Sequence, residues 1–206
     1  LKNITITRGQ IPVHSVDVAY MVDEQTGLIK VNRFSSTTYE EFMEATKQLV
    51  TDKGMKNLVI DLRHNPGGYL DAAVKILDQL FNTRKLLVYT EGRSYKRKEY
   101  NSSGKNVFDI NKVVILIDEG SASASEIIAG AIQDNDRGLV IGRRSFGKGL
   151  VQEQYELSDG SALRLTVAKY FTPSGRYIQK PYDHGEDEYN MDLQDRYNNG
   201  ELYYQD

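Results

Sequence analysis

The sequence has no cysteine among its 206 residues. This absence excludes disulfide bonds, metal sites built from thiolates and a cysteine nucleophile. It is compatible with a protein that works outside the cytoplasm, but many cytosolic proteins also lack cysteine. The absence alone therefore does not assign a compartment.

Other features are missing as well. The formal net charge is −3 and no helix is strongly basic, so there is no electrostatic case for binding nucleic acid or a membrane surface. No run approaches the roughly 18 apolar residues that a membrane span needs. The chain opens at Leu1 without a Met, a basic region or an apolar leader, which is expected of a processed chain or a fragment.

The residues that are present describe a globular α/β domain. Two apolar runs, residues 56–62 (KNLVIDL) and 113–118 (VVILID), are typical of strands buried on both faces of a parallel sheet. Amphipathic helices are expected to follow each run, and this alternation predicts parallel pairing. Further strands are expected at residues 4–7, 16–22, 28–33, 86–90, 139–142, 151–157 and 162–170.

We expect a single domain made of three regions. Residues 1–36 supply peripheral N-terminal strands, residues 37–180 form the α/β body, and residues 181–206 form an acidic tail. In the tail, Tyr189, Leu193 and Tyr197 recur every four residues, which predicts a short helix docked on the body by this face.

One serine stands where an expected strand turns into a helix. Ser123, in the segment Gly-Ser-Ala-Ser-Ala-Ser-Glu, would lie at a helix N-terminus, where unpaired N–H groups and partial positive charge favour an oxyanion. Its hydroxyl could attack a carbonyl while the N–H of Ala124 holds the oxyanion. The alternative is structural, because Ser123 and Glu126 also match a capping box.

A serine nucleophile needs a base, and the sequence offers few. The three histidines, His14, His64 and His184, fall in expected loops with no obvious serine partner. Lys148, between two glycines, is the best candidate. A lysine acts as a base only when its pKa falls from about 10.4 to roughly 7–8, through desolvation or nearby positive charge. The alternative is a solvated turn lysine.

A glycine pair forms the third element. Gly67 and Gly68 follow the strand expected at residues 56–62, and α/β folds bind ligands at the carboxyl ends of such strands. Glycines there leave backbone N–H groups free to face an anion. A plain turn or a helix cap is the competing interpretation.

Together these segments resemble the carboxyl-terminal processing (tail-specific) serine peptidases. The resemblance extends from about residue 27 to residue 179. It rests on four motifs in the family's order: DLRHNPGG at 61–68, GSASASE at 120–126, FGKGLVQ at 146–152 and YFTPSGR at 170–176. It implies a crotonase/ClpP-like core of mixed, largely parallel sheets flanked by helices.

The resemblance also implies roles for individual residues. Ser123 would be the nucleophile, Lys148 its general base and Gln152 the residue that orients the lysine. The oxyanion hole would combine the N–H of Ala124 with that of Gly67 or Gly68. Because four residues of an extended strand span about 13 Å, Gln152 would reach Lys148 only if the segment between them coils. In an extended strand, it would instead meet the backbone or the substrate.

What the resemblance implies about partners is equally specific. Substrates would be proteins or peptides, bound as extended strands along an edge near residues 162–169 and cut near their C-termini through an acyl-enzyme. No cofactor or metal would be needed, and the location would be the periplasm or cell envelope. A homo-oligomer is left open.

Two departures from the family pattern stand out. Family members usually carry a PDZ domain ahead of the core, and this chain is expected to lack one. His64 stands where the glycine motif would have asparagine. Two other functions remain open. One is a catalytically silent peptide-binding module on the same fold. The other is a crotonase-like enzyme acting on acyl thioesters, for which Glu119 and Glu126 are the nearest acids.

Overall fold

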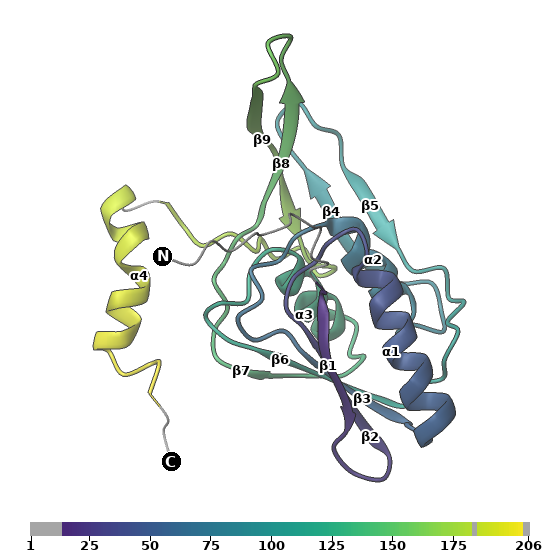
Figure 1. Cartoon of the computed structure of the whole chain (residues 1–206). Helices are drawn as coiled ribbons and strands as arrows, with labels where there is room; N and C mark the ends of the chain where they lie inside the picture. Colours follow the sequence, from purple (N-terminus) through teal and green to yellow (C-terminus); the bar gives the residue numbers. More distant parts are fainter. Residues whose placement is uncertain (1–13, 183–184, 204–206) are drawn as a thin grey trace, which may run out of the picture.

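A computed structural model describes residues 14–182 and 185–203, so the strand expected at residues 4–7 lies outside the described part (Figure 1). The helices are α1 (Thr38–Lys53), α2 (Leu70–Asp78), α3 (Ala124–Asp134) and α4 (Glu186–Asn198). The strands are β1 (Val16–Met21), β2 (Thr26–Val31), β3 (Asn57–Asp61), β4 (Leu86–Glu91), β5 (Lys98–Asn101), β6 (Lys112–Ile117), β7 (Leu139–Gly142), β8 (Leu150–Glu156) and β9 (Ala162–Phe171).

The strands form two sheets, which confirms the expected α/β class. Sheet A has the order β1-β2-β3-β6-β7, and all its neighbours are parallel except β1 and β2. Sheet B has the order β5-β4-β9-β8 and is antiparallel throughout. The carboxyl ends of β2, β3 and β6 therefore lie together at one edge of sheet A, where α/β folds place ligands.

The apolar strands of sheet A are buried on one face only. Leu58 and Ile60 in β3, and Val113 and Ile115 in β6, are almost fully buried in the core beneath the helices. The intervening Val59, Val114 and Leu116 are only half-buried. Burial on both faces, as the sequence suggested, is therefore wrong for the described residues, because helices α1 to α3 cover a single face.

Helix α3 is the most enclosed element. It contacts β6 and β7 of sheet A and also β4 of sheet B, and its residues from Ala124 to Ile132 are all buried. The sequence Ala-Ser-Glu-Ile-Ile-Ala-Gly-Ala-Ile supplies small residues that let both sheets approach it. The N-terminus of α3 is therefore fixed from several sides.

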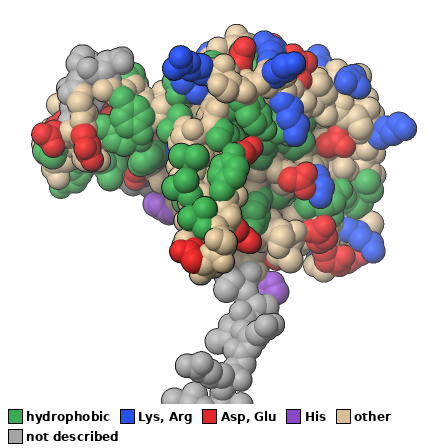
Figure 2. Space-filling view, turned by 90° about the horizontal axis from the view of Figure 1, so that it is seen from above, with side chains coloured by type: hydrophobic (Ala, Val, Ile, Leu, Met, Phe, Trp, Pro, Cys, Tyr) green, Lys and Arg blue, Asp and Glu red, His purple; other side chains and the backbone are tan. Residues whose placement is uncertain are grey.

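Strands β8 and β9 form a long hairpin that projects from the body (Figure 1). Apolar side chains gather on it, at the centre of Figure 2, and Tyr155, Leu157, Leu163 and Leu165 are each 45–51% exposed. Strand β9 pairs with β8 over residues 162–169 but with β4 only over residues 169–171. Residues 162–168 of β9 therefore have no second strand partner among the described residues, and the edge expected there is open on one side.

The tail forms helix α4, which stands beside the body (Figure 1). The apolar face expected to dock it is largely open, since Leu193 is 52% and Tyr197 49% exposed. Polar contacts hold α4 instead: the buried Arg196 donates to the carbonyl of Arg144 at 2.6 Å, Lys180 donates to the carbonyl of Tyr189 at 2.9 Å, and Asp192 pairs with both Arg144 and Lys180. Within the described residues, no helix combines the length and apolar character needed to cross a bilayer.

Candidate active site

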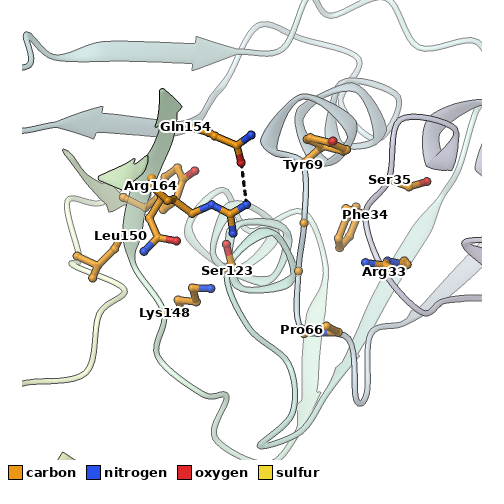
Figure 3. A pocket seen from close by; sticks show the side chains of 14 residues that line it. Arg33, Phe34, Ser35, Pro66, Tyr69, Ser123, Lys148, Leu150, Gln154 and Arg164 are labelled. Atoms are coloured by element: carbon orange, nitrogen blue, oxygen red, sulfur yellow. Dashed lines mark hydrogen bonds between the residues drawn. The ribbon is translucent and has the colours of Figure 1, made fainter. Parts of the chain in front are cut away.

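A cleft of about 760 Å³ lies between the carboxyl ends of the sheet A strands and the hairpin (Figure 3). Its lining comes from five segments that are far apart in the sequence. They are the residues after β2 (Arg33, Phe34, Ser35), those after β3 (Pro66, Gly67, Gly68, Tyr69), the start of α3 (Ser123), the segment that enters and forms β8 (Lys148, Leu150, Gln152, Gln154), and β9 (Arg164, Tyr170).

Three serines surround the start of α3, but only the middle one lines the cleft. Ser121 is fully buried, and its hydroxyl donates to the carbonyl of Leu62 at 2.8 Å. Ser125 is also fully buried and donates to the carbonyl of Asn65 at 3.0 Å. Both hydroxyls hold the loop after β3 against α3. Ser123 is half-buried and faces the cleft, so the fold singles it out.

The backbone of Ser123 is strained. Its φ of 54° and ψ of −110° fall outside the regions that residues with a side chain normally adopt. Such strain persists only where the surroundings enforce it, and it recurs at functional sites. Ser123 is also the N-cap of α3, and its N–H donates to Glu126 Oε2 at 2.7 Å. The capping interpretation and the nucleophile interpretation are therefore compatible.

The glycine loop touches the serine. A Cβ atom placed on Gly67 would lie 2.7 Å from the Ser123 Cβ and 2.6 Å from the carbonyl oxygen of Ala122, and the φ of Gly67 is +92°. Only glycine fits this approach. The N–H of Gly67 already donates to Asn65 Oδ1 at 2.9 Å. The N–H groups of Gly68 and Ala124 donate to no described residue, so within the glycine pair only the Gly68 N–H is not already engaged.

Asn65 organises this loop, a role that its turn-forming character did not reveal. It is fully buried; its Nδ2 donates to the carbonyl of Val31 at 2.7 Å, while its own carbonyl accepts the N–H of Ala122 at 3.0 Å. The residue thereby joins β2, the glycine loop and the start of α3.

Lys148 lies at the entrance to β8, and its side chain points toward Ser123 in Figure 3. Its neighbours are held on both sides. The Gly147 carbonyl accepts the N–H of Lys180 at 2.9 Å, and the Gly149 N–H donates to Gln179 Oε1 at 3.1 Å. The structure thus brings the proposed nucleophile and base to the same cleft. The Lys148 side chain is nevertheless exposed, so the described residues do not provide the desolvation considered for it from the sequence.

Glu126 joins the serine and lysine segments. Its buried carboxylate accepts the N–H of Ser123 at 2.7 Å, of Gly147 at 2.6 Å and of Lys148 at 2.8 Å, and the Ser145 hydroxyl at 2.7 Å. The sequence indicated only a helix cap. In the structure, this one carboxylate fixes the backbone of both candidate catalytic residues relative to each other.

The Gln152 side chain faces the cleft but has no hydrogen bond to Lys148 or to any other described residue. The segment from Leu150 is a strand with a bulge between Val151 and Gln152, so it does not coil toward the lysine. This geometry matches the extended alternative, in which Gln152 meets the substrate or the backbone.

Tyr170 is a titratable group in the cleft whose pKa is shifted. Burial, with weaker contributions from the nearby Tyr100 and Tyr95, raises the pKa of Tyr170 to about 12. Its phenol therefore stays protonated at neutral pH and is unsuited to act as the base.

His64 and the acidic residues lie outside the cleft. The left-handed φ of His64, 63°, is one that asparagine also tolerates, and its N–H donates to Asp118 Oδ1 at 2.8 Å. Glu119 pairs with Arg143, and no Asp or Glu lines the cleft within the described part of the chain. Among those same residues, no cluster of His, Asp and Glu could hold a metal ion.

Comparison with known proteins gives a consistent result. A family model described as "Peptidase family S41" matches residues 25–185. A carboxyl-terminal-processing protease of Synechocystis sp. is 39% identical over 183 residues, covering 87% of this chain and 42% of that protein. A carboxy-terminal-processing protease of Bartonella bacilliformis is 41% identical over 182 residues, covering 86% of this chain and 41% of that protein.

The solved structures agree. A photosystem II D1 C-terminal processing protease superposes with a TM-score of 0.72 at 34% identity, covering 84% of this chain and 47% of that one. A Bacteroides fragilis protein at 18% identity, with a TM-score of 0.66, shares the fold. The chain spans less than half the length of these relatives.

Proposed function

The chain belongs to peptidase family S41, and on this premise we propose that it is the catalytic core of a serine endopeptidase that uses a Ser123–Lys148 dyad. One observation carries the proposal: of the three serines at the start of α3, only Ser123 faces the cleft, toward which the Lys148 amine also points. We also propose protein substrates cut near their C-termini, no cofactor, and an extracytoplasmic location, as the resemblance implies.

The proposed chemistry is acyl transfer. An extended peptide pairs with the open edge of β9 at residues 162–168 and excludes water from the cleft. Neutral Lys148 takes the proton of the Ser123 hydroxyl as its oxygen attacks the scissile carbonyl. The N–H groups of Ala124 and Gly68 bind the oxyanion, and each such donor is worth about 3 kcal/mol of transition-state stabilisation. The lysine then protonates the leaving amine, and water resolves the acyl-enzyme.

The cleft lining argues against the acyl-thioester alternative. That chemistry would be supported by a catalytic carboxylate in the cleft, but the nearest acids, Glu119 and Glu126, are engaged with Arg143 and with backbone N–H groups. A silent peptide-binding module has no specific observation in its favour and remains an outcome of the test below.

The decisive experiment compares three variants on an unstructured protein substrate. Ser123→Ala and Lys148→Ala should each lower kcat/KM by about 10⁴-fold, and the double variant should lose little more, because the two residues act as a unit. Retained cleavage in Ser123→Ala would remove the assignment, and a wild type that binds peptides without cleaving them would identify the silent module.

A further inference from the structure

The cleft is positively charged in a chain that is acidic overall. Its lining contains Arg33, Arg164 and Lys148 but no Asp or Glu, although the formal net charge of the chain is −3. The mechanism above uses only the lysine. The two arginines have no part in it.

Elsewhere in the described residues, arginines are mostly paired with carboxylates. Six of them form such ion pairs: Arg63, Arg97, Arg143, Arg144, Arg176 and Arg196. The cleft arginines differ, because neither has a carboxylate partner among the described residues. Arg164 donates only to the neutral side-chain oxygen of Gln154, at 3.1 Å.

The direction of Arg164 is informative. It projects from β9 into the cleft toward Ser123, and the bond to Gln154 directs its guanidinium (Figure 3). Arg33 lies across the cleft beside Phe34 (Figure 3). A planar guanidinium matches a carboxylate through two parallel hydrogen bonds. Two cations without counter-ions in one cleft also create a field that attracts anions.

We propose that Arg164, supported by the charge of Arg33, binds a carboxylate of the substrate close to the scissile bond. The inference rests on the proposed peptidase function and assigns a specificity to the same cleft. The carboxylate can come from two sources: the C-terminus of the substrate, or the side chain of an Asp or Glu near the cleaved bond. Both sources present the same chemistry to the guanidinium.

Binding can be measured separately from cleavage. In the Ser123→Ala protein, we would titrate three forms of one unstructured peptide: a neutral C-terminal amide, the same peptide as a free acid, and the amide with single Gln→Glu changes scanned along it. Fluorescence anisotropy at low and high salt gives the dissociation constants. A carboxylate form should bind about tenfold more tightly than the neutral amide, and high salt should reduce the difference.

Variants assign the effect to Arg164. Adding Arg164→Gln should abolish the preference, and Arg164→Lys should retain part of it, because the charge remains without the planar fork. Arg84→Gln is the matched control: Arg84 is also exposed and unpaired among the described residues but lines a different pocket, so the preference should persist. Tighter binding of the free acid identifies the C-terminal carboxylate as the ligand, and tighter binding of a scanned amide identifies an Asp or Glu side chain.

The outcomes separate this inference from the proposed function. Equal binding of charged and neutral peptides, no binding of any of them, or equal effects of Arg164→Gln and Arg84→Gln would overturn the carboxylate site. Carboxylate-dependent binding without cleavage by the wild type would keep the site and refute the peptidase. A drop in cleavage of all peptides alike in Arg164→Gln, with an altered pH profile, would show that the arginine acts on Lys148 instead.

Discussion

The floor of the cleft and its hairpin wall are built in opposite ways. At the floor, the glycine loop and the start of α3 are tied by Asn65, Ser121, Ser125 and Glu126, all of them buried. The wall is a two-stranded hairpin that projects from the body and whose apolar side chains are about half exposed. We therefore expect the two parts to have different roles. The floor holds Ser123 in a fixed position, and the hairpin wall adapts to the substrate.

The largest effect is expected when a glycine of the floor is replaced by alanine, compared with the same replacement in the hairpin. Gly67→Ala should lower kcat/KM by at least about a hundredfold, because the new Cβ would lie 2.7 Å from the Ser123 Cβ and displace the serine or the oxyanion loop. Gly160→Ala is the control: Gly160, at the hairpin tip, also has a positive φ, +84°, but no atom within 4 Å of the added Cβ. It should leave kcat/KM within about twofold. Similar losses for both variants would contradict the proposed rigid floor.

The second test concerns stability. Asn65→Ala should lower the free energy of unfolding by about 2–3 kcal/mol, because it leaves the Val31 carbonyl and the Gly67 N–H without their partners in a buried place. Urea denaturation followed by circular dichroism measures the change. A loss below about 0.5 kcal/mol would mean that the loop keeps its shape without this side chain.

A third test probes positioning at the floor. Glu126→Gln keeps the shape of the side chain, but its amide nitrogen cannot accept a hydrogen bond, so part of the link between Ser123 and Lys148 is lost. We expect kcat to fall about tenfold with little change in KM. Hydrogen exchange at the amides of Gly147 and Lys148 should accelerate. Glu153→Gln on the hairpin is the control. Unchanged amide exchange in Glu126→Gln would refute the positioning role.

The smallest effect is expected on the wall. Leu163→Thr replaces a side chain that is 48% exposed with one that also favours strands, so the free energy of unfolding should change by less than about 0.5 kcal/mol. Thermal denaturation measures it. A loss of more than about 1 kcal/mol would show that the apolar face of the hairpin is packed against something in solution.

Much of the fold was accessible from the sequence, because strongly apolar strands and helix periodicity are local signals. The motifs around Gly67, Ser123 and Lys148 also lie together in the structure, as expected. Glu126 and Asn65 were read as a cap and a turn. Their decisive partners lie 21 and 34 residues away, and a local pattern contains no information about such contacts.

The errors have similar physical causes. Apolar strands looked buried on both faces, but hydrophobicity does not show whether a second layer covers a sheet. The spacing of Tyr189, Leu193 and Tyr197 correctly predicted a helix, whereas its attachment depends largely on polar contacts made by Arg196 and Asp192, which the apolar spacing does not show. The exposure of Lys148 depends on which distant segments surround it, and no short segment of sequence encodes that.

The reach of Glu126 has a mechanical consequence. Ser123 is the N-cap of a helix packed on sheet A, and Lys148 precedes β8 of sheet B. The Glu126 carboxylate therefore links the two sheets by hydrogen bonds. The hairpin of β8 and β9 can therefore bend relative to the body only beyond this link. The bulge between Val151 and Gln152 is the first irregularity in β8 where such bending can occur. Bending at this bulge lets the hairpin fit different peptides while the backbones of Ser123 and Lys148 keep their relative position.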